Sequence, residues 1–300
     1  MKIVREVAEV RAAVAGSRRV GLVPTMGAFH EGHLSLIRAA RASCDLVVVW
    51  LFVNPTQFNE ASDLSAYPRD EERDAALAAE AGADILFAPR VETVYPSGFA
   101  TTVTVAGLGD VLEGAHRPGH FAGVATVVAK MLNMVGPDVA FFGAKDAQQV
   151  AVVSRMVADL DLPTRIEVLP IVRESDGLAM SSRNVRLTPD ERRRATALHR
   201  GLAAARDAVT FGERDAAVLA GRVEQELIQA GITAEYVAVI DPVGFAPVEV
   251  IEGSALIAVA AYVGSTRLID NIEVTTGVLA SAEPPRTGRG ALPPHDTQEA

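Results

Sequence analysis

The sequence predicts an α/β protein in which a larger parallel-sheet unit precedes a smaller α+β unit. Two apolar runs indicate the parallel sheet, Val20 to Val23 and Leu46 to Val53, and the amphipathic segment between them completes a β-α-β unit. The second run is continuous between Asp45 and Asn54, which is typical of a parallel strand buried on both faces. After Thr188 the pattern changes to helical segments followed by strands, so we expect a second unit there.

Composition places the chain among globular proteins. Its 300 residues are 49% hydrophobic, which is enough apolar material for one large or two ordinary domains. The formal net charge of −10 disfavours a nucleic-acid partner, because phosphate backbones are bound by clustered Lys and Arg. Charged residues interrupt Met1 to Gly16, and no apolar run approaches the ~20 residues that span a bilayer, so we expect no membrane contact and a cytoplasmic location. The single cysteine, Cys44, suits a small buried residue.

Helices and strands are expected to alternate through the first unit. Helices are predicted at Ile3 to Ala15, Leu34 to Ala42, Asp70 to Ala81, Val124 to Val135 and from Ala147 onward. Besides the two runs above, strands are predicted at Asp84 to Phe87, Thr101 to Val105, Asp138 to Phe142 and Ile166 to Val172. Glu113 to Gly123 is expected to be a glycine-rich loop.

The second unit is expected to begin with helices. Thr188 and Pro189 have the types preferred at a helix N-cap and first turn, and they start a helix that runs toward Val209. The later elements are a helix from about Arg214 to Ala230 and strands at Ala234 to Ile240, Ser254 to Val263 and Arg267 to Glu273. We place the domains at residues 1–174 and 175–281, and we expect 282–300 to be a disordered tail.

Two histidines at the turn after the first strand are the centre of the candidate site. His30 and His33 are three residues apart at a helix start, so both rings lie on one face of its first turn. A helix N-terminus presents free N–H groups and the positive end of the dipole, which suits a phosphate chain. Gly32 between them allows a flat ring or a phosphate to approach closely. Zinc is disfavoured because a helical zinc pair usually has i, i+4 spacing, while a purely structural histidine pair stays open.

Two more loops are expected to face the same pocket, because ligands in open α/β sheets lie beyond the carboxyl ends of the strands. Asn54 and Gln57 offer neutral donors and acceptors that suit a hydroxy acid. In the loop from Gly143, Lys145 suits a phosphate and Asp146 suits ribose hydroxyls.

Arg117 and His120 lie in the glycine-rich loop, where they either reach a polyphosphate or hold the loop together. The sequence leaves these two alternatives open.

Four separated stretches resemble the pantothenate synthetase family, the pantoate-beta-alanine ligases. His-x-Gly-His is similar to the first ATP signature of the nucleotidyltransferase superfamily, and Ser181-Ser182-Arg183 resembles its second signature, K-M-S-K-S, with Arg183 in a lysine's role. The stretches are V-P-T-M-G-A-F-H-E-G-H at 23–33, F-V-N-P-T-Q-F at 52–58, G-A-K-D at 143–146 with Q-Q behind it, and I-V-R-E-S-D-G-L-A-M-S-S-R-N at 171–184.

The resemblance extends over about Val20 to Glu273 and implies an architecture and a reaction. It implies a Rossmann-like N-terminal domain, a smaller C-terminal lid domain and a homodimer. The implied reaction has two steps: pantoate attacks the α-phosphate of ATP to give pantoyl adenylate and pyrophosphate, and beta-alanine then displaces AMP to give pantothenate.

The resemblance also implies roles for individual residues. Catalysis would fall to His33, His30, Lys145 and Arg183, acting as fixed cationic donors to a phosphorus that gains negative charge. Pantoate would be held by Gln57, Gln149 and Asn54. ATP would be held by Met26, Gly27, Ala28, Phe29, His30, Glu31, Gly32, His33, Gly143, Ala144, Lys145, Asp146, the Val172 backbone, Met180, Ser181, Ser182 and Arg183.

Some positions depart from the family pattern. Ala144 and Ala147 stand where the family usually has an acid and an aromatic residue. Arg73 interrupts a pair of acids that helps to hold magnesium in the family, and Asp74 alone keeps its place. We therefore expect Mg²⁺ to arrive with ATP and name no protein ligand for it. Another adenylyl- or cytidylyltransferase, or an inactive relative with a binding or regulatory role, remains an alternative.

Overall fold

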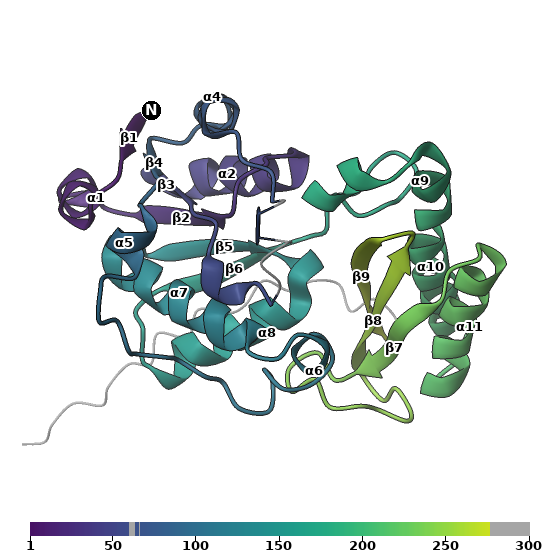
Figure 1. Cartoon of the computed structure of the whole chain (residues 1–300). Coiled ribbons are helices and arrows are strands. Elements are labelled where there is room, and N and C mark those ends of the chain that lie inside the picture. Colours follow the sequence, from purple (N-terminus) through teal and green to yellow (C-terminus); the bar gives the residue numbers. More distant parts are fainter. Residues whose placement is uncertain (60–63, 66, 277–300) are drawn as a thin grey trace, which may run out of the picture.

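The computed structural model describes residues 1–59, 64, 65 and 67–276, and its larger part is built on a six-stranded parallel sheet (Figure 1). The strand order is β1-β4-β3-β2-β5-β6, which confirms the predicted α/β class with a parallel sheet. The strands are β1 (Lys2–Val4), β2 (Val20–Thr25), β3 (Leu46–Leu51), β4 (Ile85–Phe87), β5 (Val139–Gly143) and β6 (Arg165–Leu169).

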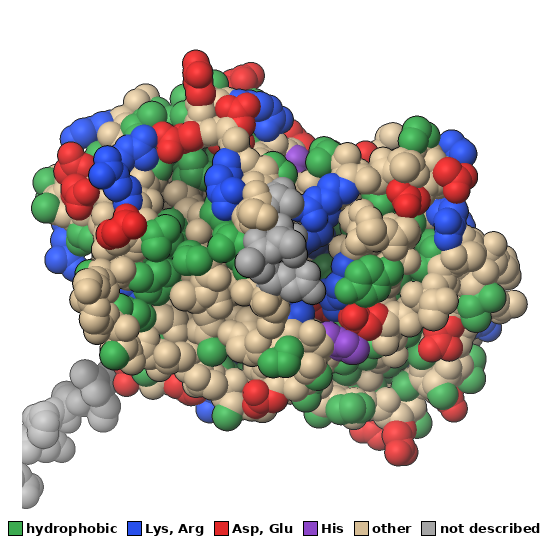
Figure 2. Space-filling view, viewed as in Figure 1, with side chains coloured by type: hydrophobic (Ala, Val, Ile, Leu, Met, Phe, Trp, Pro, Cys, Tyr) green, Lys and Arg blue, Asp and Glu red, His purple; other side chains and the backbone are tan. Residues whose placement is uncertain are grey.

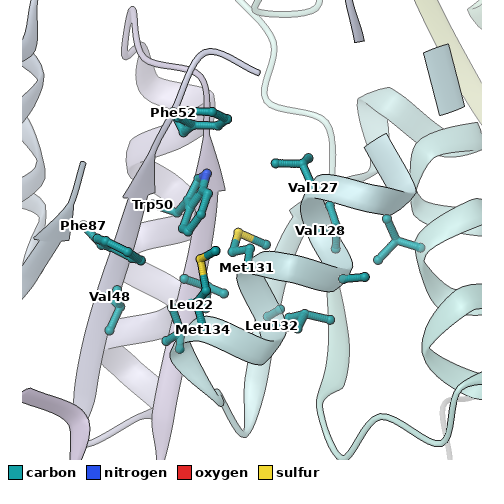
Figure 3. Close-up of a cluster of buried hydrophobic side chains, with 14 of the residues drawn as sticks. Leu22, Val48, Trp50, Phe52, Phe87, Val127, Val128, Met131, Leu132 and Met134 are labelled. Atoms are coloured by element: carbon teal, nitrogen blue, oxygen red, sulfur yellow. The ribbon is translucent and has the colours of Figure 1, made fainter. Parts of the chain in front are cut away.

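Helices cover both faces of this sheet (Figure 1). One face packs against α1 (Val7–Val14), α7 (His120–Val135) and α8 (Ala147–Asp159). The other face packs against α2 (Glu31–Ser43) and α4 (Glu71–Ala81). Figure 3 shows Trp50 of β3 between Phe87 and the side chains of α7, and the Trp50 and Phe87 rings meet edge to face at 5.0 Å. Both sheet faces are therefore buried, as the continuous apolar strands predict.

The strand order of the sheet reverses at β2. From β2 the chain proceeds to β3 and β4 on one side, whereas β5 and β6 lie on the other side. The β2–β5 pairing is limited to Gly21 with Val139 and Leu22 with Ala140. The two strands thus part before their carboxyl ends, and this topological switch point is where open α/β sheets place a ligand crevice.

The C-terminal part is a three-stranded antiparallel sheet, ordered β7-β8-β9 and backed by helices, as predicted. Its strands are β7 (Ala234–Ile240), β8 (Ser254–Val263) and β9 (Thr266–Thr275). Its helices are α9 (Pro189–Ala195), α10 (Ala197–Thr210) and α11 (Ala216–Gln229). The single helix expected to run toward Val209 is thus two helices, because the chain turns at Thr196.

The two parts meet along β9. Arg267 of β9 donates two 2.7 Å hydrogen bonds to the carboxylate of Glu113 in α6 (Glu113–His116). Beside this ion pair, Phe245 and Leu256 pack against Leu112 and the first turn of α8. Strand β9 of the C-terminal sheet therefore lies beside α6 and the turn that follows β5.

Several expected elements differ in the structure. Residues 101–105 form no strand, since no neighbouring strand pairs with them and the Val103 amide instead donates to Thr126 Oγ1. The expected loop 113–123 is mostly helical: it contains α6 and the first turn of α7, which begins after Gly119 at φ +81°. The opening segment begins with strand β1, so its helix starts at Val7 and not at Ile3.

Other expectations are adjusted or stay open. A short helix, α5 (Val91–Val94), was not expected, and β6 ends at Leu169 and not at Val172. The domain division at residue 174 and the lid role of the C-terminal part stay predictions, and the expected disordered tail at 282–300 lies outside the described residues. Among the described residues, no helix has the length and apolar character needed to cross a membrane.

Candidate active site

A cavity of about 230 Å³ lies at the carboxyl ends of β2, β3 and β5. Most of the predicted site residues line it, although they come from four separate stretches of the chain. These are Met26, His30, His33, Asn54, Gln57, Lys145, Asp146, Gln149, Met180, Ser181, Ser182 and Arg183. The structure therefore brings the two histidines, the lysine and the arginine to one cavity.

The other predicted residues do not line this cavity. They are Gly27, Ala28, Phe29, Glu31, Gly32, Gly143, Ala144 and Val172. Phe29 is 2% exposed and belongs to the core between the sheet and α2, while Glu31 is exposed and pairs with Arg38. A Cβ at Gly32 would lie 2.9 Å from the His30 ring, so glycine here admits the imidazole itself.

The turn that carries the histidines is held by a buried carboxylate. Gly27 and Ala28 both have positive φ angles, +88° and +53°. The Ala28 and Phe29 amides donate to the two oxygens of Asp74, at 2.7 and 2.8 Å, and Asp74 is 1% exposed. Asp74 thus holds a strained turn in place. The sequence alone indicated this residue only as a remnant of a magnesium site.

The two histidines interlock with the helix backbone. His30 is the N-cap of α2, and its Nδ1 accepts the amide of Gly32 at 3.2 Å. His33 Nδ1 in turn accepts the amide of His30 at 3.4 Å. Because each Nδ1 accepts a hydrogen bond, the neutral rings carry their proton on Nε2. Each ring therefore has one N–H donor that the helix does not use.

The histidines are neutral near pH 7. Burial lowers the pKa of His30 to about 4, and the positive charge of Lys145 acts in the same direction. Burial also lowers the pKa of His33 to about 3, assisted by His30 and Lys145. The expectation that both rings act as fixed cations is thus replaced by two neutral donors beside a lysine.

Lys145 supplies the positive charge next to the rings. It lies in the single turn η2 (Ala144–Asp146), which follows β5 directly. Its ammonium is half-buried and lies 3.5 Å from the Asp146 carboxylate. The carbonyl oxygens of Ala144 and Lys145 both accept from the side chain of Asn271, a residue that the sequence analysis did not single out.

The serine and arginine loop reaches the cavity from the other direction. It lies in η3 (Ser182–Arg186), where Ser181 is the N-cap and its Oγ accepts the amide of Arg183 at 3.2 Å. A short β-bridge between Arg173 and Ala179 precedes it. The Met180 amide donates to the Val172 carbonyl at 3.0 Å, so Val172 supports this loop from outside the cavity.

Of the three residues predicted to bind a hydroxy acid, Gln57 and Gln149 border the cavity with their amides, and Asn54 supports Gln57. Gln57 Oε1 accepts from Asn54 Nδ2 at 3.0 Å, and Gln57 Nε2 donates to Met26 Sδ at 2.8 Å. Asn54 is 1% exposed, and it also donates to the Gly123 carbonyl and accepts from the Tyr95 hydroxyl. Both N–H donors and both acceptor positions of the Asn54 amide are thus used by the protein, which favours a supporting role. Gln57 keeps one N–H and one acceptor position for a ligand. Gln149 lines the cavity from α8.

An apolar floor completes this end of the cavity. It is formed by Trp50, Phe52, Val124, Val127, Val128, Met131 and Phe142. The sequence analysis assigned none of these residues to the site. A usable signal was present, since the helix from Val124 to Val135 is apolar on nearly all its faces and such a helix is buried.

His120 and Arg117 hold the loop after β3 in place. His120 Nδ1 lies 2.8 Å from the Gln57 carbonyl, Arg117 Nη2 donates to the same oxygen at 3.2 Å, and the two side chains are 3.3 Å apart. Burial lowers the pKa of His120 to about 4. Both residues also line the cavity, so they border the site as well as bracing Gln57.

A second cavity of about 500 Å³ extends from the site toward the C-terminal sheet. It shares Arg117, Lys145, Gln149 and Arg183 with the first cavity, and it is bounded by β9. Figure 2 shows Lys and Arg side chains gathered in the hollow between the two parts of the molecule. In the part of the chain that the structure describes, no group of three His, Cys, Asp or Glu is arranged to hold a metal ion. The cavity can attract anions through its basic residues.

Curated relatives share the sequence over most of its length. The family model for pantoate-beta-alanine ligase matches residues 2–273. A pantothenate synthetase from Moorella thermoacetica is 53% identical over 277 residues, which cover 91% of this chain and 98% of the relative. Pantothenate synthetase 1 from Bradyrhizobium diazoefficiens is 52% identical over 280 residues, which cover 91% of this chain and 98% of the relative.

Solved structures share the fold. A pantothenate synthetase from Thermus thermophilus superposes with a TM-score of 0.87 at 47% identity, and covers 91% of this chain and 99% of its own. A pantoate-beta-alanine ligase from Francisella tularensis, complexed with beta-gamma ATP and beta-alanine, superposes with a TM-score of 0.77 at 32% identity, over 91% of this chain and 97% of its own. From the family match along nearly its whole length and from relatives this similar, the chain belongs to the pantoate-beta-alanine ligase family.

Proposed function

We propose that this protein condenses pantoate with beta-alanine at the expense of ATP, through a pantoyl adenylate, to give pantothenate, AMP and pyrophosphate. One observation carries this proposal: two Nε2–H imidazoles and the Lys145 ammonium border the same cavity as an amide wall and an apolar floor. The imidazoles and the ammonium suit a phosphate chain, whereas the amides and the apolar floor suit a branched hydroxy acid. Membership of the ligase family supports the same reaction.

In the first step, a pantoate carboxylate oxygen attacks the α-phosphorus of ATP, and the bond to the β-phosphate oxygen breaks so that pyrophosphate leaves. The phosphorus passes through a five-coordinate state in which its oxygens gain negative charge. His30 and His33 donate from Nε2, and Lys145 and Arg183 add positive charge from η2 and η3. These groups are held in place before the reaction, which lets them stabilise the transition state more than the ground state.

Pantoate is proposed to bind over the apolar floor. Its two methyl groups suit the side chains of Trp50, Val127 and Met131, and burying them contributes about 0.8 kcal/mol per buried carbon. Its hydroxyls face the amides of Gln57 and Gln149, which orient them without neutralising the carboxylate. Asn54 keeps Gln57 in this orientation through the 3.0 Å hydrogen bond between their side chains.

In the second step, the beta-alanine nitrogen attacks the acyl carbon of the adenylate, and the bond from that carbon to the phosphate oxygen breaks. AMP leaves with the electron pair, and the nitrogen loses a proton. The Francisella tularensis ligase was solved with beta-alanine and an ATP compound together, which supports one site for both. Lys145 and Arg183 can face the beta-alanine carboxylate after pyrophosphate departs, because both border the larger cavity as well.

The remaining assignments concern the surroundings of the site. We propose that Mg²⁺ enters bound to the ATP phosphates, that the protein acts in the cytoplasm, and that residues 175–281 form a lid. A homodimer is proposed as well. Strand β6 lies at the edge of the sheet, and its residue Val168 is 44% exposed, which suits pairing with a second copy.

Exchange of labelled pyrophosphate into ATP tests the reaction. We expect exchange that requires pantoate and Mg²⁺ but not beta-alanine, because the adenylate forms before the amine is needed. Exchange that needs the amine would contradict the two-step route. Exchange with another acid or alcohol in place of pantoate would favour a different nucleotidyltransferase, and binding of ATP without exchange would favour an inactive relative.

A further inference from the structure

The side chain of Asn271 connects the C-terminal sheet to the turn that carries Lys145. Asn271 lies on β9 and is 6% exposed. Its Nδ2 donates to the carbonyl oxygens of Ala144 at 3.0 Å and of Lys145 at 2.9 Å. Both partners are acceptors, so only the nitrogen of the amide can face them. The orientation of the side chain is therefore unambiguous.

Strand β9 supports the turn η2 through this amide. The turn has three residues, and neither Gly143 before it nor Asp146 at its end provides a side-chain cap. Its two consecutive carbonyls point toward β9, and both are satisfied by the one amide of Asn271. Whatever fixes these carbonyls also fixes the point from which the Lys145 side chain leaves the backbone. That side chain lies beside His30 and His33, whose pKa values its charge lowers.

The residue before Asn271 in β9, Asp270, holds the segment that leads to the Ser181–Arg183 loop. Asp270 is 2% exposed and accepts two hydrogen bonds from Arg173, at 2.7 and 3.0 Å. Arg173 opens the short hairpin that leads to Ser181 and Arg183. Successive residues of a strand point to opposite faces. Asp270 and Asn271 of β9 therefore hold two different segments: Asp270 binds Arg173, and Asn271 binds the turn that carries Lys145.

We infer that Asn271 is a positioning residue for adenylate formation, which sets the Lys145 turn relative to the Ser181–Arg183 loop through strand β9. It does not line the cavity of the histidines, but it borders the larger cavity together with Lys145. Its effect on the reaction is transmitted through Lys145. The inference rests on the proposed role of Lys145 as a donor to the ATP phosphates.

Removing the two donors should slow the chemical step. In Asn271→Ala and Asn271→Leu the carbonyls of Ala144 and Lys145 lose the hydrogen bonds from Asn271, so the turn can shift relative to β9. A displacement of about 1 Å at a reacting group costs up to about 100-fold in rate. We expect single-turnover adenylate formation to fall by about 10- to 100-fold in both variants, with a smaller change in the KM for ATP. The leucine variant refills the volume but not the hydrogen bonds.

A double-mutant cycle with Lys145→Ala separates positioning from general loss of structure. If Asn271 acts through Lys145, adding Asn271→Ala to the Lys145→Ala background should cost less than about 3-fold further. Asn133→Ala is the matched control, because Asn133 is exposed on α7 and its side chain also donates to a backbone carbonyl, that of Ala129. This control should keep the wild-type rate. All variants are compared below their melting temperatures.

The outcomes are distinct. A large loss in both Asn271 variants that vanishes in the Lys145→Ala background supports the inference. Losses that multiply in the double variant would overturn the inference. Full activity in Asn271→Leu would also overturn it, because the Asn271 side chain would then matter only for its packing. Normal activity of Asn271→Ala beside an impaired Lys145→Ala overturns the inference and leaves the role of Lys145 standing. An unimpaired Lys145→Ala overturns both.

Discussion

The imidazole rings of His30 and His33 lie 4.2 Å apart between centroids and are tilted by 37°. Two positive charges at this separation would repel each other, and burial opposes each charge as well. The pair is therefore stable as two neutral rings whose Nδ1 atoms are both engaged by backbone amides. The site thus offers two oriented N–H donors, and neither ring has to be protonated before it can donate.

This neutrality predicts the pH dependence of the first step. The pKa values of about 4 and about 3 leave both rings neutral above about pH 5. We expect kcat/KM for ATP, measured by pyrophosphate exchange, to show no acid limb near the ordinary histidine pKa of about 6.5. Ring ¹⁵N spectra at pH 7 should show the Nε2–H form for both. An acid limb near pH 6.5 that disappears in His30→Gln or His33→Gln would show that a charged ring is the active form.

Replacement of His33 by alanine should affect the transition state more than the bound nucleotide. Removing one preorganised donor typically costs about 10²- to 10³-fold in the chemical step. We expect a loss of that size in single-turnover adenylation, with a modest change in the Kd for ATP. Arg38→Ala, on the exposed side of the same helix, is the control. Near-normal adenylation by a cooperatively folded His33→Ala variant would make this histidine structural.

The histidines also predict how stability depends on pH. The pKa of His120 is lowered to about 4 in the folded protein, mainly by burial. Below about pH 6.5 the unfolded chain binds a proton that the folded chain does not, so the free energy of unfolding decreases as the pH falls toward 4. His120→Asn retains a donor for the Gln57 carbonyl but does not titrate. Between about pH 6 and 4.5 it should reduce this slope by up to about 1.4 kcal/mol per pH unit.

Urea unfolding at a series of pH values measures the effect. A slope in His120→Asn equal to that of the wild type would mean that the folded His120 takes up a proton as readily as the unfolded one.

Gln57 should discriminate between the two substrates of the first step. Its amide borders the apolar floor and the Met26 sulfur, where it suits a hydroxy acid. We expect Gln57→Ala to raise the KM for pantoate by about 10-fold, as the loss of about 1.4 kcal/mol would, and the KM for ATP by less than about 3-fold. Gln225→Ala on the exposed face of α11 serves as the control. Equal increases for both substrates would count against a pantoate site at Gln57.

Asp74 should be important for stability as well as for the site. Asp74→Ala leaves the Ala28 and Phe29 amides without acceptors, and hydrogen bonds to charged groups are worth about 1.5–3 kcal/mol each. We expect the free energy of unfolding in urea to fall by about 3–6 kcal/mol. Asp70→Ala, which removes only the exposed N-cap of the same helix, should cost about 1 kcal/mol. Equal losses would show that Asp74 does not hold the turn.

The sequence by itself determined the α/β class, most helices and strands of the parallel-sheet part, and the loops that border the cavity. A short continuous apolar run such as Leu46 to Val53 is typical of an inner strand of a parallel sheet, so the α/β class followed from the local pattern. His30, Gln57 and Lys145 each follow a strand, and parallel strands bring such positions to one edge. Residues 101–105 alternate like a strand, but no neighbouring strand pairs with them, so the expected strand is absent.

Only the tertiary structure decided the charge of the histidines, the supporting role of Asn54 and the grip of Asn271 on the Lys145 turn. Burial sets the pKa of His33, and burial depends on packing that no local pattern records. Asn271 lies more than a hundred residues from its partners, and its one signal in the sequence is a polar Asp-Asn pair between two apolar stretches of strand β9. A sequence shows which groups are present, whereas the free energy of each group depends on the neighbours that folding brings to it.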